Sequence, residues 1–227
     1  MPAYTIGTIS TFDGNSSGND FSASMPATFS AGNLLIGMTR SRSSSETLTQ
    51  PSGWTNIFTH TNVSGSIVVF AKIAAGGDGA PTISWSGSTY VTCQIASFSG
   101  DVYTDLSTIV VHSAVLNGSA VNIDVPALTV TTDNCLIISG GGHNKTAVND
   151  PVTFTNPGAY TTIGKISPNG TAMSSAWGYV QQTTASNLSA TDWTPSASES
   201  QSRSGVTIAL QTQAAGGTGA SIAWIKA

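Results

Sequence analysis

Hydrophobic and polar residues alternate with a period of two in several parts of this chain. Apolar residues occupy every second position of 121–125 and again of 206–210, with polar or small residues between them. This period is typical of β-strands that bury one face, and no stretch of twelve residues carries a convincing helical stripe. The pattern therefore predicts an all-β protein.

Other segments are apolar at successive positions. Residues 34–36, 67–70 and 135–138 show this pattern, and turn signals such as Asp13-Gly14 and Asn117-Gly118 separate the segments. We expect central strands here that are covered on both faces, or that hold one face against a partner. Many short strands with such spacing predict an antiparallel β-sandwich.

The two halves of the chain form a weak internal repeat. The matched pairs of segments are 32–37 with 133–138, 51–57 with 156–163, 66–73 with 174–181, 82–86 with 190–194, and 93–98 with 206–210. Because each half offers only four or five strands, too few to bury both faces alone, we expect a single sandwich of two pseudo-symmetric halves. Two tandem domains are the alternative.

Both ends of the chain have the composition of appendages to the middle. We expect an N-terminal strand/loop segment at 1–25, the β-sandwich domain at 26–213 and a C-terminal arm at 214–227. The arm is Gly-rich up to residue 220 and then apolar, so Ile222, Trp224 and Ile225 are predicted to bind a partner. We expect them to dock on another subunit; docking on the chain's own sandwich is the alternative.

One set of motifs resembles a known family. Its segments, in chain order, are Ala31-Gly32-Asn33-Leu34-Leu35-Ile36, Pro51-Ser52-Gly53-Trp54-Thr55, Ala71-Lys72-Ile73-Ala74, Thr82-Ile83-Ser84-Trp85-Ser86 and Ile95-Ala96-Ser97-Phe98-Ser99-Gly100-Asp101. This order resembles a β-sandwich family common in tailed-phage virion proteins and bacterial extracellular proteins. The resemblance covers about residues 27–213. It implies a jelly-roll-like fold and carries no catalytic residues.

Composition narrows the function classes. Of 227 residues only 8% are charged, 7 basic and 11 acidic, while Ser and Thr together make up about 28%. Disorder and coiled coils need far more charge, and the absence of a basic run argues against nucleic-acid binding. No apolar stretch approaches the roughly 20 residues of a membrane helix. The first residues lack the basic start and apolar run of a secretory signal.

Candidate catalytic and metal motifs are all weak. Gly14-Asn15-Ser16-Ser17-Gly18 fits the nucleophile-elbow pattern but lies between polar segments instead of a strand and a helix. The glycines before His143 lack the Lys and helix of a phosphate loop. Other candidates are a serine triad with His60, His112 or His143, and a calcium site of Asp13, Asn15, Asn19 and Asp20. Chance grouping and Asx turns explain these, so we predict no catalytic residue, metal or cofactor.

The cysteines and tryptophans have structural interpretations. Cys93 and Cys135 are expected to be buried free thiols, with a disulfide left open. The repeat places Trp85 with Trp193 and Trp177 with Phe70, which favours core positions over a sugar-stacking platform. Trp224 has no counterpart in the other half.

These observations lead to a functional hypothesis. We expect a non-enzymatic virion protein of a tailed phage, located on the capsid surface after assembly in the host cytoplasm. It would be a capsid decoration or cement protein that binds the major capsid protein or another virion protein. A homo-oligomer is expected, with a trimer favoured. The alternatives are a tail or fibre component, or a carbohydrate-binding adhesin module that recognises a host-surface glycan.

Overall fold

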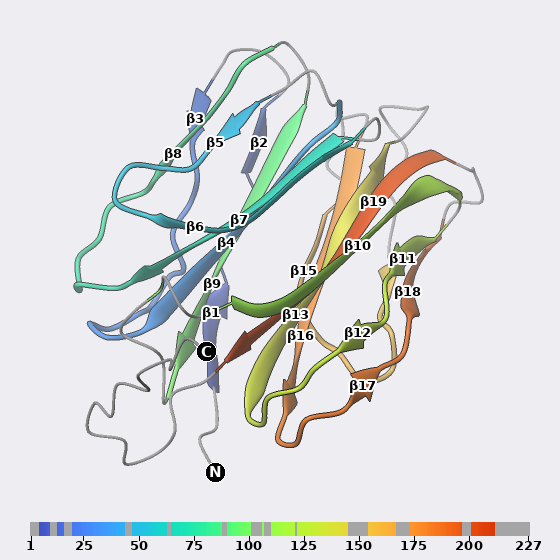
Figure 1. Ribbon diagram of the computed structural model, residues 1–227. Coiled ribbons are helices and arrows are strands. Elements are labelled where there is room, and N and C mark those ends of the chain that lie inside the picture. The colour runs from blue at the N-terminus through green and yellow to red at the C-terminus, as the bar shows by residue number, and fades with distance from the viewer. Residues whose placement is uncertain are drawn as a thin grey trace, which may run out of the picture.

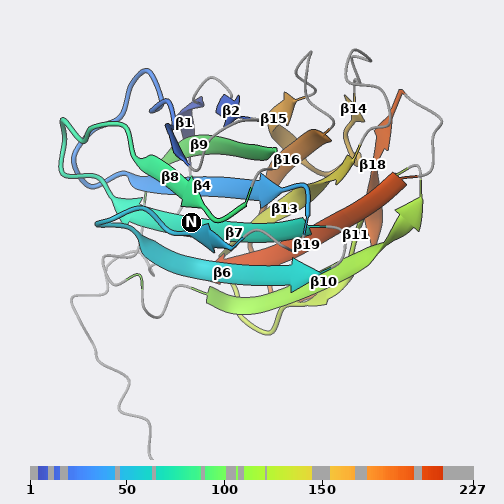
Figure 2. The ribbon, with the colours of Figure 1, turned by 90° about the horizontal axis from the view of Figure 1, so that it is seen from above.

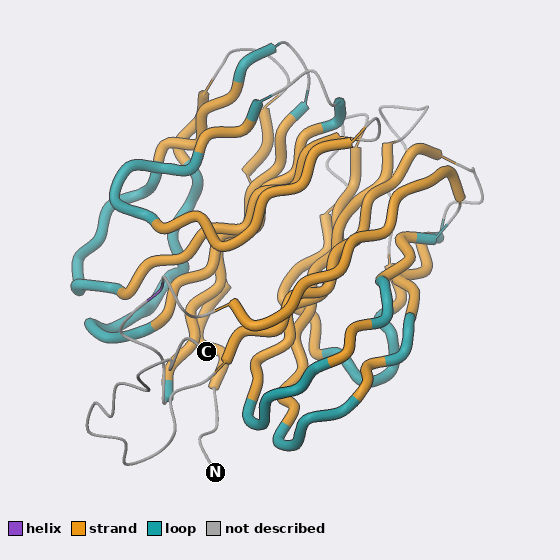
Figure 3. The backbone as a smooth tube through the Cα atoms, in the orientation of Figure 1, coloured by secondary structure: helices purple, strands orange, loops and turns teal. Residues whose placement is uncertain are grey.

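The fold is built from antiparallel β-strands. The computed structural model describes residues 5–9, 13–15, 20–43, 47–62, 65–87, 90–100, 106, 110–120, 122–144, 154–166, 173–196 and 201–211. Within these ranges there is no α-helix, and the strands form several antiparallel sheets (Figure 3). The predicted all-β, antiparallel sandwich is therefore confirmed.

The first half of the chain contributes nine strands. They are β1 (Thr5–Ile9), β2 (Asp13–Asn15), β3 (Asp20–Ser22), β4 (Leu34–Ser41), β5 (Leu48–Thr49), β6 (Thr55–Asn62), β7 (Gly65–Ile73), β8 (Thr82–Trp85) and β9 (Val91–Ser99). A large inner sheet has the order β1-β9-β4-β7-β6, with β2 also paired to β9, and a small outer sheet has the order β3-β8-β5. The chain alternates between the two sheets, as in a jelly roll.

The second half repeats this plan. Its strands are β10 (Val110–Ala120), β11 (Ile123–Val125), β12 (Leu128–Thr129), β13 (Cys135–Asn144), β14 (Phe154–Thr155), β15 (Thr161–Ile166), β16 (Met173–Gln182), β17 (Asn187–Leu188), β18 (Thr191–Pro195) and β19 (Gln201–Gln211). The inner sheet has the order β10-β19-β13-β16-β15, and the outer sheet has the order β11-β18-β14. An additional two-stranded sheet, β12-β17, has no counterpart in the first half.

The sheets stack as four layers (Figure 1). The two inner sheets face each other over a central core that includes Leu34, Ile36, Phe98, Leu136 and Trp177. Edge strands β6 and β10 come together on one side of the stack (Figure 2). Each inner sheet is also covered on its other face by its own small sheets, over separate cores. This explains the segments that are apolar at successive positions: all eight residues of β4 are buried.

The number of strands per half corrects one expectation. Four or five strands could not bury both faces of a half, but the described strands number nine and ten. The additional ones are mostly two to five residues long, as in β5, β12 and β17. Strands this short show too few alternations to be recognised in a sequence. Each half therefore forms two layers of its own and still packs on the other half through the central core.

The matched segments of the internal repeat fall in corresponding strands of the two halves, but the sequence match is out of register in the central strands. Gly32 and Asn134 both have positive φ, 85° and 54°, and the residue two positions after each, Leu34 or Leu136, faces the central core. Leu34 therefore corresponds to Leu136, whereas the sequence match paired it with Cys135. By strand pairing, Phe70 corresponds to Gly178, because they lie opposite Gly37 and Ser139. Trp177 thus does not match Phe70.

The N-terminal segment belongs to the sandwich. Strands β1 and β2 pair with β9, and β3 pairs with β8. The described part of residues 1–25 therefore completes the inner and outer sheets of the first half and is not an appendage. The C-terminal arm, 214–227, lies outside the described residues, and with it the predicted partner-binding residues Ile222, Trp224 and Ile225.

Candidate functional site

One end of the interface between the inner sheets is polar. Arg40 of β4 is fully buried, and its guanidinium donates from Nε to Ser204 Oγ (3.2 Å) and from Nη2 to Asn144 Oδ1 (3.3 Å). Burial, followed by the charge of Arg42, lowers the pKa of Arg40 to about 9. Nearby, Thr92 Oγ1 and Ser175 Oγ lie 3.3 Å apart across the same interface. These contacts join the two halves with hydrogen bonds where the central apolar core ends.

His143 lies beside this polar layer and is also buried. Its Nε2 is 3.2 Å from Ser174 Oγ, and its Nδ1 is 2.8 Å from the carbonyl oxygen of Asn144. The ring also contacts Phe154 edge-on, with the ring centroids 5.8 Å apart. A buried His and Ser without open access have a structural role here, because a nucleophile must reach its substrate.

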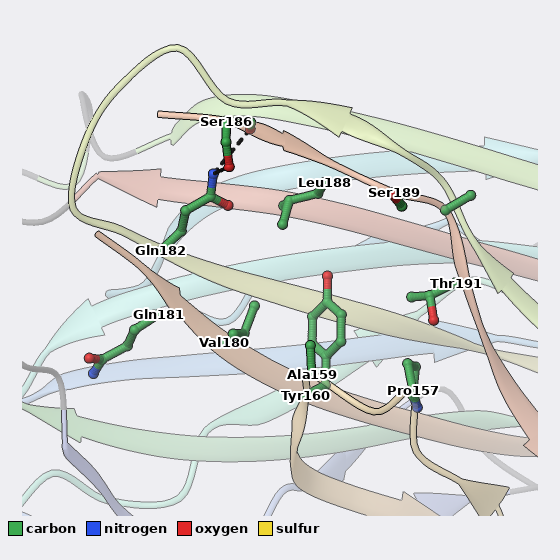
Figure 4. Close-up of a pocket in the computed structure, with 11 residues that line it drawn as sticks. Pro157, Ala159, Tyr160, Val180, Gln181, Gln182, Ser186, Leu188, Ser189 and Thr191 are labelled. Atoms are coloured by element: carbon green, nitrogen blue, oxygen red, sulfur yellow. Dashed lines mark hydrogen bonds between the residues drawn. The ribbon is translucent and has the colours of Figure 1, made fainter. Parts of the chain in front are cut away.

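The structure contains a surface groove in the second half. It has a volume of about 420 Å³ and is lined by Pro157, Ala159, Tyr160, Val180, Gln181, Gln182, Ser186, Leu188, Ser189, Ala190 and Thr191. Tyr160 is directed into the middle of the groove, toward the segment that carries Leu188 and Ser189 (Figure 4). Apart from the Tyr160 phenol, no lining side chain is ionisable. Leu188 and Val180 pack on the core beneath the groove.

The groove wall depends on two local hydrogen-bonded turns. The Tyr160 N–H donates to the Pro157 carbonyl (3.0 Å), and Asn156 Nδ2 donates to the Tyr160 carbonyl (3.2 Å). On the opposite wall, Gln182 Nε2 donates to the Ser186 carbonyl (3.0 Å) and to Ser186 Oγ (2.7 Å). Burial raises the pKa of Tyr160, so its phenol is neutral at physiological pH. The groove is therefore an uncharged slot with an apolar floor and a rim of amides and hydroxyls.

The sequence identified only part of this groove. The turn before Tyr160 was recognised as the partner of Pro51-Ser52-Gly53-Trp54. On the opposite wall, Ala190 and Thr191 begin the matched segment 190–194, whereas Ser186, Leu188 and Ser189 belong to no matched segment and reach the groove only through the fold. The position of this wall depends on the β12-β17 sheet, whose strands are too short to show a period.

The cysteines and tryptophans are placed as core residues. Cys93 and Cys135 are both buried and free, and they lie in different cores, so the free-thiol interpretation is confirmed. The four described tryptophans are 0–6% exposed, which excludes them as an open stacking platform. Trp85 and Trp193 both lie in strands of the outer sheets, β8 and β18, and both are buried core residues, as expected. They are not equivalent in the repeat, however. Leu48 and Phe154 lie at equivalent positions before the two proline turns, and they pair with Trp85 and Pro195. Trp85 therefore corresponds to Pro195, two positions after Trp193.

The described residues contain neither a cluster of metal-ligating side chains nor a membrane-spanning helix. No group of three or more His, Cys, Asp or Glu side chains among them is arranged to hold a metal ion. In the same part of the chain, no helix is long and apolar enough to cross a membrane. Of the calcium candidates, Asp13, Asn15 and Asp20 fall in strands β2 and β3, and Asn19 lies outside the described residues.

Comparison with known proteins adds no relative. No family model matches the chain, and neither curated proteins nor solved structures give a match.

Proposed function

We propose that this protein is a structural, non-enzymatic component of a tailed-phage virion. Its most direct role is that of a capsid decoration protein that binds the major capsid protein and its own copies on the capsid surface. A tail or fibre position is the nearest alternative within the same class. The resemblance over residues 27–213 supplies the virion setting, and the surface chemistry supports the molecular role.

The observation that carries the proposal is how the structure distributes charge. All four described cationic side chains are buried or half-buried, and each has a partner. Arg40 donates a hydrogen bond to Ser204 in the second half, and Arg42 lies over the Tyr90 ring. Lys72 and Arg203 form ion pairs with Asp78 and Asp124. Among the described side chains, the exposed charges are three aspartates, Asp20, Asp133 and Asp192. Two of these already accept hydrogen bonds, Asp133 from the Ala185 N–H and Asp192 from Asn122.

Covering a surface of this kind with another protein requires little desolvation free energy. Removing a charged group from water costs far more than removing a hydroxyl or amide that finds a new hydrogen bond. The centres of protein interfaces are correspondingly depleted of charged residues. The exposed residues of 181–194, in β16, β17, β18 and the segments between them, are mainly Thr, Ser, Ala, Asn and Gln, which suits close packing against neighbours in a shell.

The proposal is tested on purified phage particles. Quantitative mass spectrometry should find this chain in stoichiometric amounts relative to the major capsid protein. Hundreds of copies per particle support decoration, whereas a few copies support the tail position. Purified protein should also rebind particles that lack it. Absence of the chain from purified particles would overturn the proposed function.

The second candidate function is glycan binding, and the groove is the observation that favours it. Its rim of Gln, Ser and Thr side chains offers the hydrogen bonds that sugars need. Sugar rings also stack on exposed aromatic faces, but Tyr160 is only 8% exposed. This alternative is tested by screening the natural chain and the Tyr160→Ala variant on the same glycan array and comparing the glycans that each protein binds. Signal that depends on Tyr160 would favour the adhesin role.

A further inference from the structure

We propose that the Tyr160 groove is the docking site for the apolar tip of the C-terminal arm, residues 221–225, of the same chain. The inference goes beyond the virion role and does not depend on it. It assigns an occupant to a groove that the strands leave open. It also favours the chain's own sandwich over a neighbouring subunit as the place where Ile222, Trp224 and Ile225 bind.

The first argument is proximity. Strand β19 ends at Gln211, which pairs with Cys135, and Cys135 pairs on its other side with Gln182 in the groove wall. Neighbouring strands lie about 4.8 Å apart, so Gln211 lies about 10 Å from the backbone of Gln182. The segment that follows β19 therefore starts beside the groove.

The second argument is reach. Nine residues, 212–220, separate Gln211 from the tip, and most of them are Gly, Ala or Thr. An extended chain spans about 3.3 Å per residue, so this linker covers about 30 Å. A Gly-rich linker also bends easily. The tip can therefore turn around the end of the inner sheet and lie along the groove.

The third argument is chemical complementarity. The tip, Ser221-Ile222-Ala223-Trp224-Ile225, contains no charge, and the groove contains no charged side chain. In an extended segment Ile222 and Trp224 lie on the same side, because side chains alternate. That side fits the floor formed by Tyr160, Val180 and Leu188. The amides and hydroxyls of the rim, such as Gln182 and Ser189, can bond the backbone of the tip.

The choice of the same chain follows from local concentration. A short flexible linker holds its end at a millimolar effective concentration near its own attachment point. A second copy reaches that concentration only in a crowded assembly. In dilute solution the groove is therefore filled by the arm of its own chain.

The test uses Trp224 as an intrinsic probe. The other four tryptophans are 0–6% exposed, so acrylamide quenching reports mainly on Trp224. The Trp224→Phe variant supplies the background to subtract. Docking predicts weak quenching of Trp224 in the full-length chain, with blue-shifted emission. Ala190→Arg places a bulky charge on the exposed groove rim and should increase the quenching constant of Trp224 several-fold, with a red shift.

The matched control is Ala185→Arg. Ala185 is also exposed and lies five residues before Ala190, but it does not line the groove, so this variant should behave like the natural chain. Equal quenching of Trp224 in the natural chain and in Ala190→Arg would overturn the proposal. Protection that appears only as protein concentration and oligomer size rise would overturn the same-chain assignment and place the tip on a neighbouring subunit. Neither result depends on whether phage particles contain the protein.

Discussion

Trp54 and Tyr160 close the same turn in the two halves of the molecule. Each donates its backbone N–H to a proline carbonyl three residues earlier, at 3.1 Å for Pro51 and 3.0 Å for Pro157. An amide side chain before each proline, Gln50 or Asn156, donates to the carbonyl of the aromatic residue. The surroundings then diverge. Trp54 packs edge-on against Phe70, whose counterpart is Gly178, while Tyr160 lines the groove.

Because Gly37 packs closely against the Phe70 ring, we predict that position 37 accepts no larger residue without a loss of stability. A Cβ on Gly37 would overlap the Phe70 ring, so Gly37→Ala should destabilise the protein by about 1–3 kcal/mol. Urea denaturation measures the loss. Adding Phe70→Leu should recover part of it, because the smaller side chain makes room. Gly79→Ala, which meets no atom within 4 Å, should leave stability almost unchanged, and a similar loss there would contradict the steric explanation.

The buried guanidinium of Arg40 predicts a difference between two replacements. Arg40→Ala leaves a cavity between the halves and removes the hydrogen bonds to Ser204 and Asn144, so a loss of about 2–4 kcal/mol is expected. Arg40→Met fills most of the volume without burying a charge and should cost about 1–2 kcal/mol less. Urea midpoints at pH 7 compare the variants. Equal losses would mean that the cation itself holds the halves together.

The two thiols are predicted to be unreactive until the protein unfolds. Burial, followed by the charge of Asp133, raises the pKa of Cys135 from 9.0 to about 11, and Cys93 is 1% exposed. Ellman's reagent at pH 8 should therefore detect no thiol in the native protein and two in urea. The protonated thiol favours the folded state, so its contribution to stability is complete below pH 9 and is lost as pH rises through about 11. Rapid labelling of the native protein would contradict this.

The turn at Gly76-Gly77 predicts an acid-sensitive contribution. The Lys72 ammonium holds the pKa of Asp78 below its ordinary 3.8, and the Ala75 N–H donates to the same carboxylate at 2.7 Å. A lowered carboxyl pKa stabilises the fold above pH 3.8, and this contribution is lost as pH falls through the folded-state pKa. Asp78→Asn should cost about 1 kcal/mol at pH 7. Thermal unfolding measures the difference in Tm between this variant and the natural chain, and this difference should become smaller as the pH is lowered. A Tm difference that does not change with pH would contradict the ion-pair explanation.

The strand repeat shows how far pattern matching reaches. Matching letters placed Gly32-Asn33-Leu34 on Asp133-Asn134-Cys135, one residue out of register. In the structure, the residues with left-handed backbone, Gly32 and Asn134, are the equivalent ones. A shift of one residue moves every side chain to the other face of a strand. The segments were therefore predicted correctly, while the face of Trp177 was not.

The groove could not be predicted from local sequence patterns either, because its two walls come from separate parts of the chain. One wall comes from the turn before Tyr160, and the other comes from residues 186–191 near the two-residue strand β17. Short strands carry no periodic signal, and their positions depend on contacts with residues far away in the sequence. The polar contacts of Arg40 are similar, since Ser204 is 164 residues distant.

Local pattern by itself determined the longer strands, the turns and the matched segments of the internal repeat, because alternation and turn residues act over a few neighbouring positions. The repeat also indicated that the tryptophans of the sandwich occupy core positions. Only the tertiary structure decided that each half has its own outer layer, that Cys93 and Cys135 lie in separate cores, and that a neutral groove opens beside the end of β19. These features depend on which sheets face each other, and that is settled by the burial of apolar surface between segments remote in the chain.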